Sequence, residues 1–138
     1  MKTLTHRLFG RGRIPMPYRT QLESEGLVAM DEGIRSVLHN PVLKTPTLRS
    51  AGYWRIFTGA IALSQKRLMA FEGARKIIDL PLADPRLRQM RFEVAGPDRL
   101  RVVFDPALFH DDWSGVMDFT FRTPLAASFS TALTAAQA

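Results

Sequence analysis

Apolar and polar side chains alternate along several stretches in the second half of the chain. Residues 89–94 carry an apolar side chain at every second position, and residues 116–122 do the same with Met117, Phe119 and Phe121. Successive side chains of a β-strand point to opposite faces of a sheet, so this spacing is typical of half-buried antiparallel strands. A chain with several such stretches has to bury one face of a sheet, and the pattern therefore predicts a mainly β fold.

Turn signals divide the chain into about seven strands. The residues expected to be extended are 27–33, 53–63, 67–71, 75–80, 89–94, 100–104 and 116–122. A long loop is expected over residues 34–49, because Pro41 and Pro46 interrupt any strand there. That loop should hold one irregular extended piece around Val42–Lys44, and Gly59 is expected to form a bulge in the next strand.

The chain is expected to end in an amphipathic helix. Thr123 and Pro124 are good residues for opening a helix, and the alanine-rich segment behind them repeats Leu125, Phe129 and Leu133 at four-residue spacing. Residues four apart lie on one face of a helix, so these side chains form an apolar stripe. We expect that stripe to cover an open end of a bent sheet.

The first 19 residues hold most of the net charge of +6. They contain no acid, and their five basic residues are Lys2, Arg7, Arg11, Arg13 and Arg19. Two glycines and two prolines accompany these charges, so we expect residues 1–19 to form a basic, flexible and loosely docked arm. Thr20 and Glu23 fit a capping box and Gly26 a helix end, which predicts a short helix at the start of a single domain over residues 20–138. Removal of the arm is therefore expected to leave the fold intact.

Length and composition exclude several classes of protein. With 138 residues, 46% of them hydrophobic and 23% charged, the chain fits one globular domain. The absence of cysteine excludes disulfides and zinc–thiolate sites, and no apolar run reaches the ~18 residues of a transmembrane helix. The basic start is not followed by the apolar run of a signal peptide. We therefore expect a cytoplasmic protein without a transmembrane segment.

The order of the expected elements resembles the pleckstrin-homology-like (PH-like) domains, including the bacterial PH-like and GRAM-like domains. The most specific segment is the expected hairpin over residues 59–71, in which a glycine, an apolar alternation, a polar turn and Arg67-Leu68 follow one another. The resemblance covers roughly residues 27–136. It implies a bent antiparallel sheet or barrel of about seven strands capped by the C-terminal helix, in a bacterial and cytoplasmic interaction module.

The same resemblance implies where an anionic ligand would bind. In the phosphoinositide-binding members of this superfold, basic residues come from the loop between the first two strands and from the strand after it. The corresponding residues for binding an anionic ligand are Arg35, Lys44, Arg49 and Arg55. Arginine forks match phosphate oxygens well, but loop cations of this kind also solvate an ordinary β-domain.

One short cluster suggests a metal or catalytic site. His110, Asp111 and Asp112 adjoin one another, but adjacent residues of one loop rarely converge on a single ion. Asp105 with Pro106 predicts a short helical turn just before them. The sequence shows no nucleophile–base pattern and no phosphate-binding glycine loop. We therefore expect no catalytic residue, no metal, no cofactor and no enzymatic activity.

Three aromatic residues begin one of the expected strands. Tyr53 and Phe57 share a face of that strand, and Trp54 lies on the other face. Most aromatic side chains are buried, so we expect these three to be core residues, with self-association through one face as the alternative.

Three functions remain open. The leading hypothesis is a non-enzymatic module that acts through protein contacts or self-assembly, with an unknown protein or a second copy as its partner. The second is a peripheral membrane module that binds anionic lipid through the basic arm or the Arg35–Arg55 loop. The third is a small enzyme or ligand-binding protein, which a pocket lined by convergent polar groups would favour. Nucleic acid is not expected as a partner, because the excess charge lies in the arm and not on the domain.

Overall fold

The computed structural model describes residues 12–138, and a seven-stranded antiparallel sheet is its main element. The strands run in the order β6-β5-β4-β1-β10-β8-β7. Their bounds are β1 Leu27–Asn40, β4 Tyr53–Ser64, β5 Arg67–Glu72, β6 Arg75–Pro81, β7 Arg91–Gly96, β8 Arg99–Phe104 and β10 Met117–Arg122. The fold is mainly β, and the number of strands in this sheet confirms the prediction.

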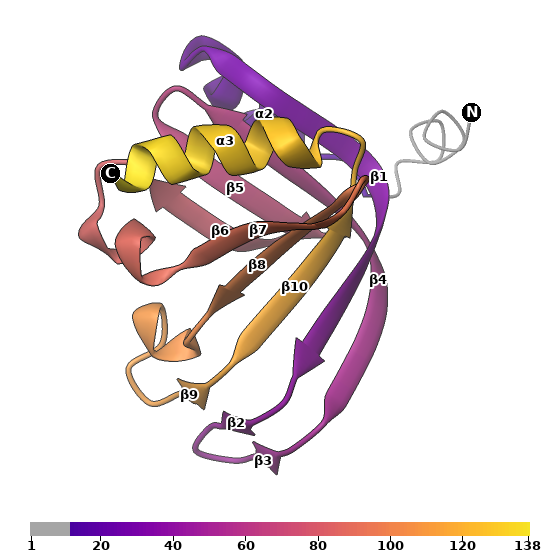
Figure 1. Ribbon diagram of the computed structural model, residues 1–138, viewed down its shortest axis with the longest axis vertical. Coiled ribbons are helices and arrows are strands. Elements are labelled where there is room, and N and C mark those ends of the chain that lie inside the picture. Colours follow the sequence, from indigo (N-terminus) through magenta and orange to yellow (C-terminus); the bar gives the residue numbers. More distant parts are fainter. Residues whose placement is uncertain (1–11) are drawn as a thin grey trace.

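Short elements complete the fold. A second sheet of three strands has the order β3-β2-β9 and lies at one end of the molecule (Figure 1). The short elements are β2 Leu43–Lys44, β3 Arg49–Ser50, β9 Ser114–Gly115, the helices α2 Met16–Ser24 and α3 Ala126–Gln137, and the 3-10 turns η1 Pro85–Gln89 and η2 Pro106–Leu108. The carboxylate of Asp105 accepts a hydrogen bond from the N–H of Ala107 at 2.8 Å, which confirms the predicted helical turn. No helix in the described residues, α2 and α3 included, has the length and apolar character needed to cross a membrane.

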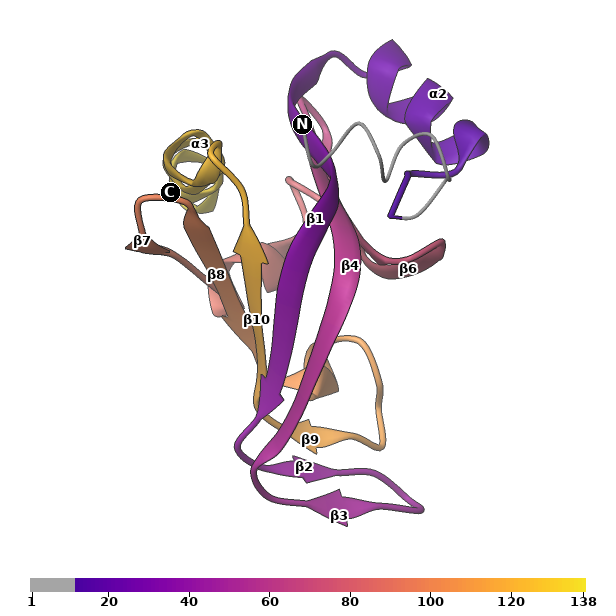
Figure 2. The same ribbon diagram turned by 90° about the vertical axis from the view of Figure 1, so that its right-hand side faces the viewer.

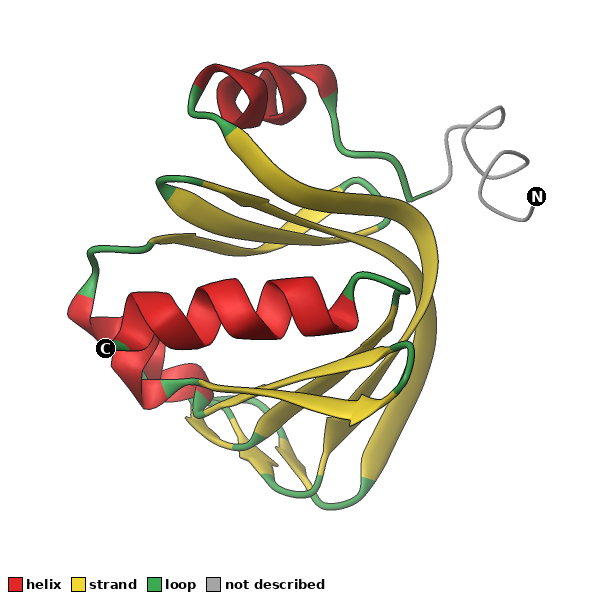
Figure 3. Cartoon of the chain, turned by 45° about the horizontal axis from the view of Figure 1, so that its top comes forward, coloured by secondary structure: helices red, strands yellow, loops and turns green. Residues whose placement is uncertain are grey.

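The large sheet bends strongly but does not close. The two longest strands, β1 with 14 residues and β4 with 12, run through both halves of the bend (Figure 1, Figure 2). β6 and β7 are the edge strands, and no pairing joins them in the part of the chain that the structure describes. Of the two forms expected from the sequence, a bent sheet and a barrel, the protein has the bent sheet. α3 lies across the open side between the two edges (Figure 3) and packs on β7 and β8.

Phenylalanine side chains fill the inside of the bend. The ring of Phe57 meets the rings of Phe119 and Phe121 edge-on, with centroids 6.2 Å and 6.4 Å apart. This is an arrangement that the ring quadrupoles favour. Phe129 and Leu133 of α3 are fully buried in the same core. The C-terminal helix therefore completes the core, as its apolar stripe predicts.

The helix α3 begins after the Thr123-Pro124 pair that was expected to open it. Its first residue is Ala126, and the hydroxyl of Thr123 accepts a hydrogen bond from the N–H of Leu125 at 3.1 Å. The same hydroxyl donates to the buried carboxylate of Asp31 at 2.8 Å. Thr123 therefore ties the turn before the helix to β1, and this contact is long-range and was not visible in the local pattern.

The strand β1 is longer than the alternating pattern predicts, because it continues through residues 34–40. The prediction of a loop over this segment is wrong. Ile34 and Leu38 point into the core, but the other two inward positions hold Ser36 and Asn40, which are polar and buried. Two buried polar residues on the inward face hide the period-2 pattern from a reading of the sequence.

The β1–β4 pair has two register shifts, and in both the extra residue lies in β1 and not at Gly59, so that prediction is also wrong. The register shifts between Asp31 and Ile34, where two residues of β1 stand opposite one of β4. Gly33 in this bulge has a φ of 64°, which favours glycine. Gly59 meets a different constraint, because a Cβ there would come within 2.8 Å of the carbonyl oxygen of Phe71.

The helix α2 starts earlier than the predicted capping box. Its first residue is Met16, directly after Pro15, so Thr20 and Glu23 lie inside the helix and do not cap it. Proline is well suited to the start of a helix because its φ is fixed and the missing N–H would have no partner there. The expected capping box is therefore wrong.

The described part of the predicted arm is docked on the sheet. Ile14 is buried, and its N–H donates to the carboxylate of Glu32 at 2.7 Å. Glu32 is also buried and forms an ion pair with Arg19 of α2. The loosely docked arm that was expected over residues 1–19 therefore does not include residues 14–19, and residues 1–11 lie outside the described residues.

Candidate functional site

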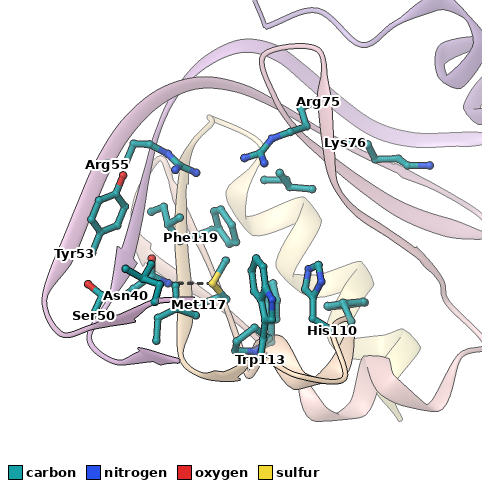
Figure 4. Close-up of a pocket in the computed structure, with 17 residues that line it drawn as sticks. Asn40, Ser50, Tyr53, Arg55, Arg75, Lys76, His110, Trp113, Met117 and Phe119 are labelled. Carbon is teal, nitrogen blue, oxygen red and sulfur yellow. Dashed lines mark hydrogen bonds between the residues drawn. The ribbon is translucent and has the colours of Figure 1, made fainter. Parts of the chain in front are cut away.

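A cavity of about 460 Å³ lies inside the bend, next to the β2–β3 hairpin (Figure 4). Its apolar wall includes Leu38, Ile77, Phe104, Phe109, Trp113, Met117 and Phe119. Its polar side chains are Asn40, Ser50, Tyr53, Arg55, Arg75, Lys76 and His110. Sites for small molecules usually measure about 300–1,000 Å³ and combine an apolar lining with a few polar groups, so this cavity has the size and lining of such a site.

Strand alternation and one loop place these side chains. Leu38, Phe104 and Phe119 point inward from the neighbouring strands β1, β8 and β10 and form the apolar floor. The rings of His110 and Trp113 stack at 4.0 Å in the loop between η2 and β9. The pairing of β9 with β2 holds this loop against the hairpin, so the second sheet closes one side of the cavity.

Two guanidinium groups converge at one side of the cavity (Figure 4). Arg55 of β4 and Arg75 of β6 each donate to the same carboxylate oxygen of Glu72, both at 2.7 Å. One carboxylate faces two guanidinium groups, so the three side chains retain a net positive charge. An excess of arginine charge beside an apolar wall is suited to pairing with an anionic group.

Arg55 has an unused hydrogen-bond donor. Its Nε is buried and has no hydrogen-bond partner in residues 12–138. The ring of Tyr53 lies 6.0 Å from the guanidinium carbon and gives it no acceptor. A buried donor without a partner costs roughly 1–3 kcal/mol, so an acceptor that reaches Nε would be bound more tightly.

Lys76 lines the cavity but its charge is already compensated. Its ammonium donates to Asp79 at 2.8 Å and lies 4.5 Å from the ring centroid of Tyr18. The hydrogen bond to Asp79 raises the pKa of Lys76 above its ordinary value. Figure 4 shows the Lys76 ammonium directed away from Arg55 and Arg75. The positive charge that faces the cavity therefore comes from the two arginines.

The four residues expected to bind an anionic ligand do not come together in one site. Arg55 lines the cavity, whereas Arg35 lies on the outer face of the sheet beside Trp54. Lys44 and Arg49 lie on the β2–β3 hairpin and border a shallow hollow of about 360 Å³. Arg35 and Arg55 lie on adjacent strands but at positions that point to opposite faces, and this separates them.

The basic arm is only partly described. Arg19 forms its ion pair with the buried Glu32, so its role is structural. Arg13 is exposed. The three remaining cations of the arm, which are Lys2, Arg7 and Arg11, lie outside the described residues.

The acidic cluster around His110 does not form a metal site. Residues 12–138 hold no group of three or more His, Cys, Asp or Glu side chains that could bind a metal ion. The ring of His110 stacks on Trp113, whereas Asp111 and Asp112 are exposed in the turn. The side chains of His110, Asp111 and Asp112 therefore do not converge on one point, although the residues are adjacent in the sequence.

The aromatic residues at the start of β4 are only partly core residues. Phe57 is buried, as expected. Tyr53 is 42% exposed and Trp54 is 63% exposed, so the expectation of burial is wrong for both. They begin β4, next to the short sheet β3-β2-β9 at one end of the molecule (Figure 1).

No protein-family model, curated protein or solved structure matches this chain. The fold and the cavity alone define its class, a mainly β domain whose bent antiparallel sheet encloses an apolar cavity with cations at one side. The resemblance to the PH-like domains stays a prediction.

Sequence reasoning missed part of this site. Arg75 begins the expected strand 75–80, where a cation is ordinary and gives no signal. Trp113 lies in the loop before β9, where no local pattern shows that it lines a cavity. The one local signal was a set of aromatic residues at inward positions of β8 and β10, and two of them, Phe104 and Phe119, line the cavity.

Proposed function

We propose that this domain is a non-enzymatic binding module for an anionic amphiphile, meaning a molecule with an apolar chain and a carboxylate or phosphate group. The observation that carries the proposal is the apolar cavity with Arg55 and Arg75 converging at one side. Among the three hypotheses from the sequence, this supports a ligand-binding protein.

The apolar wall supplies the larger part of the expected affinity. Transfer of a CH₂ group from water into an apolar site contributes about 0.8 kcal/mol. The aromatic rings of Phe104, Phe119 and Trp113 offer a wall on which a chain can pack. A ligand with an extended apolar part is therefore favoured over a small polar anion.

The polar side chains orient the acidic group of the ligand. Arg55 and Arg75 supply the charge, and the hydroxyls of Ser50 and Tyr53 have no hydrogen-bond partner among the described residues. Asn40 is already engaged, because its Nδ2 donates to the carbonyl of Val116 at 3.0 Å. The acidic group is therefore expected on the side of the cavity where the arginines and free hydroxyls lie.

The side chains of the cavity support binding more than catalysis. His110 stacks on Trp113 and forms no side-chain hydrogen bond in the described part of the chain. A nucleophile–base pair requires the two groups within hydrogen-bond reach of one another, and His110 has no such neighbour.

Laurate is expected to displace the fluorescent sulfonate 1-anilinonaphthalene-8-sulfonate from the cavity, and dodecanol to displace it roughly tenfold less well. The two competitors share a chain length and differ in charge, so the difference measures the contribution of the arginines. Fluorescence titration of the full-length protein gives both apparent dissociation constants.

Two variants assign the binding to the cavity. Arg75→Ala should weaken laurate binding roughly three- to tenfold, with dodecanol unchanged, because the side chain is charged but largely exposed. Arg91→Ala is the matched control, since its side chain is 66% exposed against 67% for Arg75 and lies on β7. Ser50→Phe should narrow the cavity and weaken the binding of the probe and of both competitors. Unchanged displacement in Ser50→Phe would place the probe elsewhere and contradict the proposal.

A second candidate function is peripheral binding to an anionic membrane through the β2–β3 hairpin. Lys44 and Arg49 are cross-strand partners, and neither forms an ion pair or a hydrogen bond through its side chain with a described residue. Like charges directly opposite one another destabilise a sheet, so an external anion would stabilise this pair. Val42 and Leu48 beside them are about half exposed, which suits insertion into the headgroup region.

Co-sedimentation with liposomes tests this second function. The double variant Lys44→Gln/Arg49→Gln should weaken binding to phosphatidylserine-containing vesicles roughly thirtyfold, since each cation near an anionic leaflet contributes about 1 kcal/mol. The charge-matched control Arg88→Gln/Arg91→Gln should bind like the wild type. Equal losses of binding in the two double variants would mean that only the total charge matters and not the hairpin. Binding of the wild type to vesicles of pure phosphatidylcholine would mean that it does not recognise charge.

A further inference from the structure

Three arginines lie side by side on the outer face of the large sheet. Arg122 of β10 and Arg99 of β8 are direct cross-strand partners. Ser36 of β1 pairs with Phe121, which places Arg35 next to Arg122 on the same face. Figure 2 shows β8, β10, β1 and β4 side by side. The three guanidinium groups therefore form one row across neighbouring strands.

This row has little compensation by acids. Arg122 is 3.7 Å from a carboxylate oxygen of Asp98, and both side chains are about half exposed. Arg35 and Arg99 form no ion pair or side-chain hydrogen bond with a described residue, and like charges on neighbouring strands repel. The row is therefore held in an unfavourable arrangement unless an anion binds.

Two further acids of this face, Asp118 and Glu93, are paired with a different arginine. Arg101 donates to both oxygens of Asp118, at 3.0 Å and 2.7 Å, and to Glu93 at 2.7 Å. These contacts hold the pKa of Arg101 well above its ordinary value, and the hydrogen bonds to Asp118 contribute most. Compensation is therefore complete at Arg101 and nearly absent in the adjacent row.

An exposed aromatic platform borders the same row. The rings of Trp54 and His39 stack at 3.7 Å with an angle of 10° between their planes. His39 covers one face of the indole, and Trp54 is still 63% exposed, so its other face is open. Trp54, the three arginines, Val37 and Thr120 line a single hollow of about 220 Å³.

We infer that this hollow binds a nucleotide unit, with its phosphate on the arginine row and its base stacked on Trp54. Arginine forks match phosphate oxygens, and bases stack on exposed aromatic rings whatever their sequence. The unit comes from a free nucleotide or from a single-stranded nucleic acid, and both present the same phosphate and base. The sequence led to the opposite expectation about nucleic acid, because basic and acidic residues are nearly equal in number outside the arm. Such a balance does not show that the basic residues gather on one part of the folded surface.

Fluorescence polarisation with labelled oligouridine at low salt tests the inference on the full-length protein. Arg99→Gln and Trp54→Ala should each weaken binding roughly tenfold. Arg88→Gln is the matched control, an exposed arginine of η1 that changes the charge equally, and should remain within about twofold of the wild type. Urea melts of all variants confirm that they are folded, as expected for side chains this exposed.

Competition identifies the source of the nucleotide unit. Displacement of the oligonucleotide by UMP at comparable phosphate concentration assigns a free nucleotide, and displacement only by unlabelled oligouridine assigns a single strand. Three results would overturn the inference. The first is that neither oligouridine nor UMP binds, and the second is that Arg99→Gln and Arg88→Gln lose affinity equally. The third is that Trp54→Ala binds oligouridine as well as the wild type does and that polyglutamate competes as well as unlabelled oligouridine. The last result would assign the surface to acidic peptides.

Discussion

Replacing Phe129 with alanine is expected to lower the free energy of unfolding by about 3–5 kcal/mol. Phe129 is fully buried in the core that α3 shares with the large sheet. The change removes an aromatic ring that lies between α3 and the large sheet. Because the paired strands of the sheet cannot move far toward the helix, the cavity is only partly refilled. Urea denaturation followed by circular dichroism gives the free energy of unfolding of the variant and the wild type.

Two further variants separate loss of packing from loss of the helix. Phe129→Leu should cost clearly less than Phe129→Ala, because most of the apolar volume remains. Thr131→Ala lies on the exposed side of α3 and should change stability by less than about 0.5 kcal/mol. A loss under about 1 kcal/mol in Phe129→Ala would mean that α3 does not complete the core.

Replacing Arg19 with methionine is expected to destabilise the protein by about 3–5 kcal/mol. The substitution leaves the carboxylate of Glu32, whose side chain is only 3% exposed, without its cationic partner. The N–H of Ile14 still donates to that carboxylate, but one neutral hydrogen bond does not compensate a buried charge. The loss should appear in the same denaturation experiment.

A double-mutant cycle tests whether the buried charge is the cause. Glu32→Gln keeps an oxygen for the N–H of Ile14 and removes the charge, so Arg19→Met/Glu32→Gln should be more stable than Arg19→Met alone. Arg35→Met is the matched control, an exposed arginine of β1, and should change stability by less than about 0.5 kcal/mol. Equal losses in Arg19→Met and in the double variant would show that packing of the arginine stem matters and its charge does not.

The docking of the N-terminal segment also changes what truncation should do. Removal of residues 1–19 was expected to leave the fold intact. The deleted segment includes Ile14, which is buried, and Arg19, which neutralises Glu32. The truncated protein is therefore expected to lose at least the stability lost in Arg19→Met.

Local patterns predicted the elements whose residues interact mainly with their neighbours in the chain. The turn between the expected strands 67–71 and 75–80, where Gly73 has a positive φ, and the helical turn after Asp105 depend on residues a few positions apart. The stripe of Phe129 and Leu133 predicted the buried face of α3, because four-residue spacing places both on one side of a helix. The alternation in β8 and β10 predicted strands, because every second side chain of a strand lies on the same face of the sheet.

Contacts between distant residues decided the features that the sequence analysis missed. Ser36 and Asn40 sit in inward positions of β1 and are buried. The amide of Asn40 donates at 3.0 Å to the carbonyl of Val116, which is 76 residues away in the chain, and the hydroxyl of Ser36 donates at 3.3 Å to the carbonyl of Ile34. Glu32 and Ile14 are 18 residues apart, and nothing local shows that one will bind the other. A period-2 pattern is a reliable signal only where the inward residues are apolar, and β1 breaks that condition.

The amino-acid sequence by itself determined a mainly β domain with a buried C-terminal helix, because alternation and helical spacing are properties of the chain that any sheet or helix has to satisfy. The tertiary structure alone decided where the cations act. Arg35 and Arg55 look alike in the sequence, yet pairing of their strands turns one to the outer face and the other into the cavity. A side chain's face depends on strand register, and register is set by long-range packing rather than by neighbours in the chain.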